Sequence, residues 1–184
     1  MKVRQKLSLI AAMGIFSSSL VALPTSADGA KLGGKWTTNP KTITTVLPSA
    51  YQTPMNDSIV AWNSIFSQIG SARRIDKTSV SSSTVTLNAV SYGNTSWNAQ
   101  GQPGPSITSG TYTYGTMRLN RTYMDAYTAR KKRAISAHEW GHLLGLAHRD
   151  GKVLMNVQGS GVYYDQWGIF YPTSADKTDL DQIY

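Results

Sequence analysis

The sequence of 184 residues contains no cysteine, one glutamate and three histidines. The absence of cysteine excludes disulfide bonds, thiolate metal sites and a cysteine nucleophile. Hydrophobic residues make up 40% of the chain and charged residues 15%, which excludes both a disordered, highly charged chain and a membrane protein with many spans. The length suits one domain with a single core. All three histidines and the only glutamate lie between positions 138 and 148.

Residues 1–27 have the features of a secretory signal peptide. Three basic residues precede an apolar stretch at 7–23, and small residues at 25–27 suit cleavage. The alternatives are a buried N-terminal helix or a retained membrane anchor, but the serines and glycine in the stretch make it marginal for spanning a bilayer. Its removal takes away three basic and no acidic residues, which lowers the net charge from +8 to +5. We therefore expect a secreted, extracellular domain of residues 28–184 with no membrane span.

The pattern of apolar residues predicts a single α/β or α+β domain in which helices pack against a sheet. Alternating and β-branched residues predict strands at 41–47, 73–80, 84–92, 111–114 and 116–123. Apolar residues at helical spacing predict helices from 56 or 57 to 70, at 128–144 and at 174–184. Residues 93–110 contain four glycines and two prolines and are expected to form loops.

The segment His138–His142 reads HEWGH, which places two imidazoles on one face of a helix, where they can bind one metal ion. Gly145 permits the left-handed conformation that ends a helix, so the chain can turn there and bring His148 to the same ion. Three neutral imidazoles and one water form an open, catalytic zinc site. The alternative, three histidines on an ordinary amphipathic helix, would crowd together rings that repel one another when charged.

The same segment supplies a candidate general base. Glu139 follows the first histidine, so its carboxylate can reach a water on the metal without being a ligand itself. Zinc lowers the pKa of such a water from about 15.7 toward about 7, and Glu139 would accept its proton and pass it to the leaving amine. Asp150 is the nearest competing carboxylate, and its place after the third histidine indicates a turn residue.

Residues 138–148, with the pattern HExxHxxGxxH, resemble the zinc motif of the metzincin metalloproteases, and Met155 resembles the Met-turn methionine that these enzymes place beneath the zinc. Trp62 in a first helix, a strand at 116–120 and a closing helix at 178–184 are similar to the matrixin branch. The resemblance implies a metzincin-like α+β domain with a twisted mixed sheet, an active-site helix and a C-terminal helix. It also implies that His138, His142 and His148 bind one zinc ion and that Glu139 is catalytic.

The chain departs from the matrixin pattern at several points. Arg149 stands where matrixins usually have serine, directly after the third histidine. No further histidine exists to hold a second, structural zinc, and no cysteine exists to keep the enzyme latent.

Four further features have two interpretations each. The basic run at 130–133 could attract anionic polymers such as the cell wall, although a solvated helix turn is favoured. The aromatic residues between 163 and 171 are implied to line the substrate pocket, or they belong to the core. Asp176, Asp179 and Asp181 could hold Ca²⁺, although capping or ion-pair roles are favoured. The edge strand of the cleft falls in 95–102 or in 107–114.

These observations predict a secreted, monomeric, zinc-dependent endopeptidase that acts on protein or peptide substrates and has no nucleic-acid partner. One alternative is a zinc-holding module that binds cell surfaces through its basic face, although such a module has no need of Glu139. The other is a zinc amidase that acts on cell-wall amide bonds.

Overall fold

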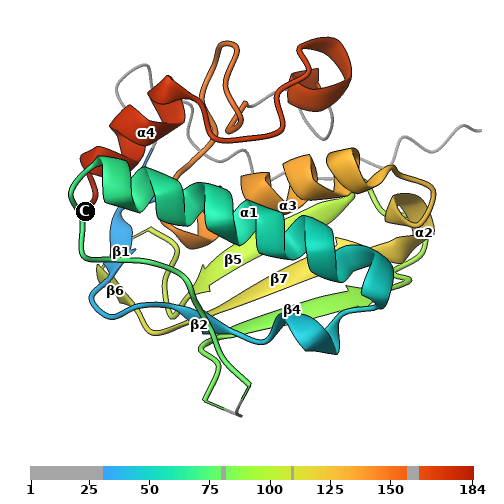
Figure 1. The fold of residues 1–184 in the computed structure, drawn as a ribbon, viewed down its shortest axis with the longest axis horizontal. Helices are drawn as coiled ribbons and strands as arrows, with labels where there is room; N and C mark the ends of the chain where they lie inside the picture. The colour runs from blue at the N-terminus through green and yellow to red at the C-terminus, as the bar shows by residue number, and fades with distance from the viewer. Residues whose placement is uncertain (1–30, 80–81, 109, 157–161) are drawn as a thin grey trace, which may run out of the picture.

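The computed structural model describes residues 31–79, 82–108, 110–156 and 162–184, so the predicted signal peptide at 1–27 lies outside the described residues. These residues form an α+β domain with two sheets and several helices, as the sequence predicts (Figure 1). The helical elements are η1 Thr44–Val46, α1 Ser49–Gln68, α2 Arg121–Met124, α3 Ala129–Leu143, η2 Val162–Gln166 and α4 Ser174–Asp181. The strands are β1 Gly34–Trp36, β2 Lys41–Thr42, β3 Asp76–Lys77, β4 Val85–Val90, β5 Ala99–Gly104, β6 Gly110–Tyr112 and β7 Tyr114–Asn120.

The larger sheet has five strands in the order β3-β2-β4-β7-β5. Strand β5 runs antiparallel to β7, whereas the other pairs are parallel, so the sheet is mixed. Strands β1 and β6 form a separate parallel pair. Strand β5 is therefore an edge strand of the sheet, and the helix α3 packs against both β5 and β7.

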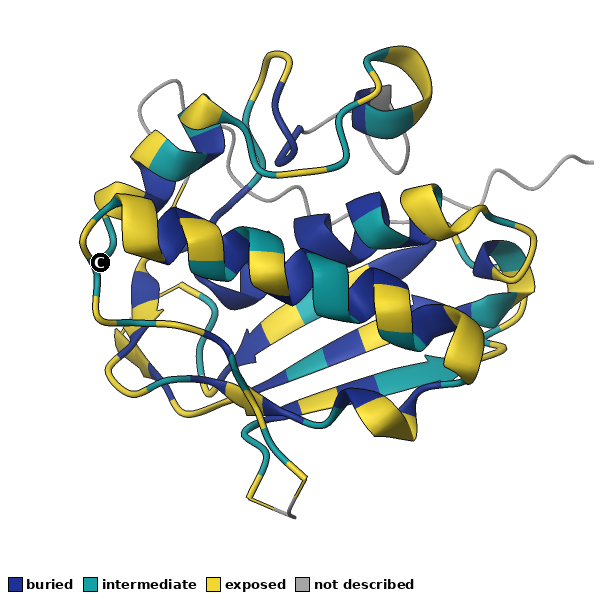
Figure 2. Ribbon diagram, in the orientation of Figure 1, coloured by how far each residue is buried: buried dark blue, intermediate teal, exposed yellow. Residues whose placement is uncertain are grey.

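Helices α1 and α3 pack against each other and against the larger sheet (Figure 1). Figure 2 shows that their buried residues face each other and the sheet. Three buried tryptophans tie α3 in place through their indole N–H groups. Trp62 donates to the Ala137 carbonyl over 2.8 Å, Trp36 donates to the Leu143 carbonyl over 2.7 Å, and Trp140 lies 3.1 Å from the Met55 sulfur. The segment after α3 and the helix α4 lie on the side of α3 that faces away from the sheet (Figure 1).

Helix α1 begins earlier than the sequence predicts, at Ser49 rather than at 56 or 57. Pro54 stays inside the helix, although proline removes a helical hydrogen bond. The helix extends through it because Tyr51 and Met55 are buried and continue the apolar face formed by Ile59 and Trp62. Burial of this face therefore outweighs the local signal of the proline.

Several predicted strands are shorter than expected. The strand predicted at 41–47 is wrong beyond Thr42, because the chain turns into the 3-10 helix η1 and the Leu47 N–H bonds the Thr44 carbonyl. Of the strand predicted at 73–80, residues 73–79 are described, and only β3 within them is a strand. The strand at 84–92 is confirmed as β4, and the one at 111–114 corresponds to β6. The strand predicted at 116–123 corresponds to β7 as far as Asn120 and is wrong beyond it, because the Asn120 side chain caps the helix α2 that follows.

The expectation of a loop throughout 93–110 is wrong, because β5 lies within it. Glycine and proline are unfavourable inside central strands, but an edge strand tolerates them. Gly101 has a further role, because a Cβ at this position would overlap the Glu139 carbonyl oxygen and lie 2.9 Å from its carbonyl carbon. A residue without a side chain thus lets β5 approach α3.

The two C-terminal helices agree with the prediction. The Thr128 side chain accepts from the Lys131 N–H at the start of α3, and Thr173 and Asp176 form a capping box at the start of α4. None of the helices in the described part of the chain is both long enough and apolar enough to span a membrane.

Candidate metal centre

Helix α3 carries His138, Glu139 and His142 in its last two turns, where the helix is buried. The side chains of these three residues are between 6% and 7% exposed. The two histidines lie one turn apart on the same face, as their spacing predicts.

The chain reverses direction directly after α3. Gly145 has a φ of 100°, a left-handed conformation that residues with side chains rarely adopt, and the Leu146 N–H bonds back to the Gly141 carbonyl. A Cβ at Gly145 would also lie 2.7 Å from the Gly34 carbonyl oxygen. The turn brings His148 to the two histidines of α3, as the sequence predicts.

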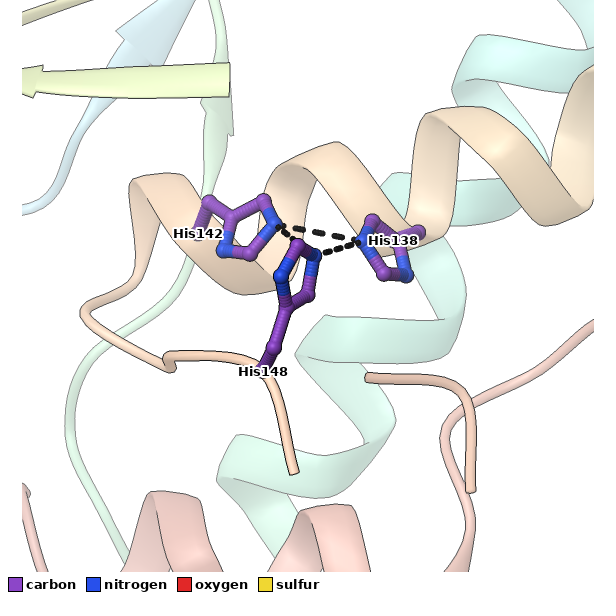
Figure 3. Close-up of side chains that lie close together, drawn as sticks. All are labelled: His138, His142 and His148. Carbon is purple, nitrogen blue, oxygen red and sulfur yellow. Dashed lines mark hydrogen bonds between the residues drawn. The ribbon is translucent and has the colours of Figure 1, made fainter. Parts of the chain in front are cut away.

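The three histidines point their Nε2 atoms at one another (Figure 3). The Nε2 atoms of His138 and His148 are 3.0 Å apart, those of His138 and His142 are 3.2 Å apart, and those of His142 and His148 are 3.1 Å apart. Nitrogens that bind a tetrahedral zinc at about 2.0–2.1 Å lie about 3.3 Å from one another. The cluster therefore has the dimensions of a tetrahedral metal site.

Hydrogen bonds at the other ring nitrogens fix the tautomers of two rings. The Nδ1 atom of His138 lies 2.7 Å from the Leu154 carbonyl oxygen, and that of His142 lies 2.9 Å from the Leu146 carbonyl oxygen. Because a carbonyl oxygen only accepts, each Nδ1 carries a proton, which leaves a bare lone pair on Nε2 of a neutral ring. The lone pairs of His138 and His142 thus face each other, and His148 could donate a single proton to one of them at most.

Burial keeps all three imidazoles neutral. It lowers the pKa of His138 well below its ordinary value, and the neighbouring His142 and His148 lower it further. The pKa of His142 falls to about 3 for the same main reason, and that of His148 is also lowered by burial. Protonation therefore cannot relieve the repulsion between the lone pairs near neutral pH, whereas a bound cation relieves all of it. These rings are positioned to hold a metal ion.

Glu139 is buried beside the histidines, and burial raises the pKa of its carboxyl group to about 8. The backbone N–H of Gly101 in β5 donates to this carboxylate and opposes the increase. A nearby metal ion would lower the pKa further by favouring the charged form. The contact joins the edge strand to the candidate base, and no local sequence signal predicted it.

Met155 packs directly on α3 between the two helical histidines. It is 1% exposed, and a Cβ at Gly141 would overlap its sulfur and lie 2.9 Å from its methyl carbon. The preceding residue, Leu154, supplies the carbonyl that orients His138. Met155 therefore packs against α3 at Gly141, one residue before His142.

Helix α4 fixes the backbone at Leu154 and Met155 through a buried carboxylate. Asp176 is 0% exposed, and its two oxygens accept from the backbone N–H groups of Leu154 and Met155, each over 3.1 Å. Asp179 forms an ion pair with Arg149. The capping and ion-pair roles are thus confirmed for these two residues, and the aspartates are not among the groups of described residues that could hold a metal ion.

Of the aromatic residues after Met155, Tyr163 belongs to the buried core, and Tyr164, Trp167 and Phe170 are partly buried and pack against it, as the core interpretation predicts. Tyr163 is 2% exposed, and its ring stacks on the His138 ring with centroids 5.0 Å apart and planes 8° apart. Phe170 and Tyr171 lie further out. The candidate edge strand is β5, which overlaps the first of the two segments left open by the sequence.

The interpretation of the basic run as a solvated helix turn holds for Arg130, which is exposed, but is wrong for Lys132. Lys132 is 6% exposed and lies over the Tyr51 ring, while Arg130 lies 4.0 Å from the Phe170 ring centroid and Arg133 lies 4.2 Å from that of Tyr171. The cationic groups pack on aromatic faces that come from distant parts of the chain, which the sequence could not reveal. The run therefore helps to hold the 170–171 segment against α3.

No protein-family model matches this chain, and a comparison with curated proteins finds no similar sequence.

Proposed function

We propose that this protein is a zinc-dependent endopeptidase of metzincin type, most similar to the matrixin branch. The observation that supports the proposal best is the set of converging imidazole lone pairs, with a buried glutamate as the next residue after the first of them. His138, His142 and His148 would hold the metal, and no thiolate or carboxylate competes with them in the cluster. A set of three neutral nitrogen ligands suits zinc and leaves a position open.

Zinc in such a site supplies an acidified water with a pKa of about 7 and polarises a carbonyl group. Glu139 accepts the proton of the attacking water at its carboxylate and delivers it to the leaving amine. The Gly101 N–H holds the carboxylate in place during this transfer. The Nδ1–H bonds to Leu154 and Leu146 fix the rings and raise their basicity.

The experiment uses the purified chain with casein as an unstructured protein substrate. We expect one tightly bound zinc per chain, casein hydrolysis that a zinc chelator abolishes, and recovery when zinc is added back. The variant Glu139→Gln keeps the shape of the side chain but cannot accept a proton. It should retain zinc while hydrolysis falls by about 10²–10⁴-fold, the usual contribution of a general base.

The outcomes separate the alternatives. Wild-type protein that binds zinc and hydrolyses cell-wall amide bonds but not casein would favour the amidase. Wild-type protein that binds zinc and hydrolyses neither would favour the surface-binding module. Wild-type turnover in Glu139→Gln would refute the assigned base. Absence of zinc from wild-type protein would refute the metal site.

We also propose that the enzyme is exported, because residues 1–27 have the pattern of a signal peptide. Sequencing the N-terminus of the protein recovered from the culture medium tests this. A chain that begins near residue 28 supports export with cleavage, and an intact chain retained in the cells would contradict it.

A further inference from the structure

Among the described residues, the third histidine lacks the hydrogen-bonded support that the first two have. His138 and His142 each use Nδ1 to bond a backbone carbonyl, but no hydrogen bond to the Nδ1 of His148 is present among the described residues. His148 also lies outside α3, in the loop that follows it. Its ring position therefore depends on how the backbone of this loop is held.

Arg149, the residue directly after this histidine, is held at both its backbone and its side chain. Its N–H donates to the Met155 carbonyl over 2.8 Å. Its guanidinium donates to the Asp179 carboxylate of α4 over 2.7 Å, and the two side chains are 25% and 5% exposed. A charge-assisted bond in such a place is short and resists screening by solvent.

The helix α4 contacts the loop at two points. Asp176 and Asp179 are three residues apart, which places them on the same face of the helix. Asp176 binds the backbone N–H groups of Leu154 and Met155. The Leu154 carbonyl in the same part of the loop orients His138. Asp179 binds the side chain of Arg149, the residue that follows His148 in the loop. One helix thus fixes the supports of both the first and the third histidine.

We infer that the Arg149–Asp179 pair is a positioning pair that sets the affinity of the histidine cluster for zinc. This inference rests on the proposed function, because it assumes that the cluster binds zinc. Arg149 is also one of the points at which this chain departs from the matrixin pattern, which usually has serine there. The function of the pair is to hold the His148 backbone, and neither residue belongs to the cluster of described side chains that could hold a metal ion.

The test measures zinc binding and folding stability in parallel. Removing one partner leaves a buried charge alone and could unfold the protein, so the informative variant is Arg149→Met with Asp179→Leu, which replaces both charged side chains by apolar ones. Arg149→Lys keeps the charge but not the planar fork. The matched control is Arg74→Met, which breaks the Arg74–Asp76 pair on the surface, where the arginine side chain is 66% exposed.

Each protein is titrated with zinc chloride against a chromophoric chelator, and its metal-free form is unfolded in denaturant. We expect the double variant to unfold like wild type but to bind zinc about 10–100-fold more weakly, the usual effect of losing an outer-shell partner. The zinc affinity of Arg149→Lys should lie between those of wild type and the double variant, and the zinc affinity of Arg74→Met should equal that of wild type. The absorption bands of the cobalt-substituted double variant should also change, because they report ligand geometry.

Zinc affinity within twofold of wild type in the double variant, with unchanged cobalt bands, would overturn the inference and leave the proposed function intact. A wild-type protein that binds no zinc would overturn both. A loss of stability without a change in zinc affinity would assign the pair to the fold alone, which also overturns the inference.

Discussion

Replacing Gly145 by Ala should destabilise the protein and weaken the metal site, because this glycine combines an unusual backbone conformation with close packing. Its φ is 100°, and a Cβ would lie 2.7 Å from the Gly34 carbonyl oxygen. Gly151 provides a matched control. It has the same φ of 100°, but no atom of the described residues, apart from Gly151 itself and its two chain neighbours, lies within 4 Å of the position that a Cβ would take.

The two variants share the cost of a strained backbone, about 1–3 kcal/mol. Only Gly145→Ala has a steric overlap, because ordinary contact requires about 3.5 Å, so the turn and β1 must separate by about 0.8 Å. Overpacking of this kind costs about 1–3 kcal/mol. We therefore expect Gly145→Ala to lower the free energy of unfolding by about 1–3 kcal/mol more than Gly151→Ala.

The displacement should also reach the histidines. The carbonyl of Leu146, the next residue, holds the His142 ring, and the Gly145 carbonyl accepts from the Leu32 N–H over 2.8 Å. A turn that moves away from β1 therefore shifts the partner of the second histidine. Zinc affinity should fall in Gly145→Ala by more than it falls in Gly151→Ala.

Equilibrium unfolding in guanidinium chloride, with and without zinc, measures both effects. Unfolding free energies of the two variants that agree within about 0.5 kcal/mol, the usual range for substitutions without a steric conflict, would refute the packing argument. Equal zinc affinities would refute the link between the turn and the metal site.

Substitutions at two further positions, Met155 and Gly101, test the supports of the site. Met155→Leu, which conserves volume, should lower the free energy of unfolding by less than about 1.5 kcal/mol. Met155→Ala should lower it by about 2–5 kcal/mol. The alanine variant should also bind zinc more weakly, because the helix that carries His138 and His142 loses the side chain that packs against it. Unchanged zinc affinity in Met155→Ala would make this residue an ordinary core methionine. Gly101→Ala should force β5 away from Glu139 and lower casein hydrolysis by about 10²-fold, the effect of misplacing a catalytic group by about 1 Å. Gln102→Ala, an exposed neighbour on the same strand, is its control, and equal activity in the two would contradict the contact.

The spacing of the histidines was sufficient to predict the cluster from the sequence. Residues four apart share a helix face whatever surrounds them, and Gly145 signals the turn that returns His148. The helices α3 and α4 were predicted because their caps and apolar positions lie within a few residues of one another. The α+β class followed from the order of these local signals.

Features that depend on contacts between residues far apart in the sequence could be identified only from the tertiary structure. The edge strand β5 looks like a loop in the sequence because it contains two glycines and a proline. An edge strand tolerates these residues because it pairs with a neighbour, here β7, on one side only. The start of α1 depended on burial of Tyr51 and Met55, and the basic run lies on rings from other elements.

The same division holds within the site. The sequence determined which side chains could bind a metal, because that depends on residue type and on spacing along one helix and turn. The tertiary structure decided how those side chains are held: by the Leu154 carbonyl, by the Gly101 N–H and by the two aspartates of α4. These partners are between 15 and 40 residues away from the groups they bind, so no local pattern encodes them. Their positions follow from packing of α3 between the sheet and the C-terminal segment.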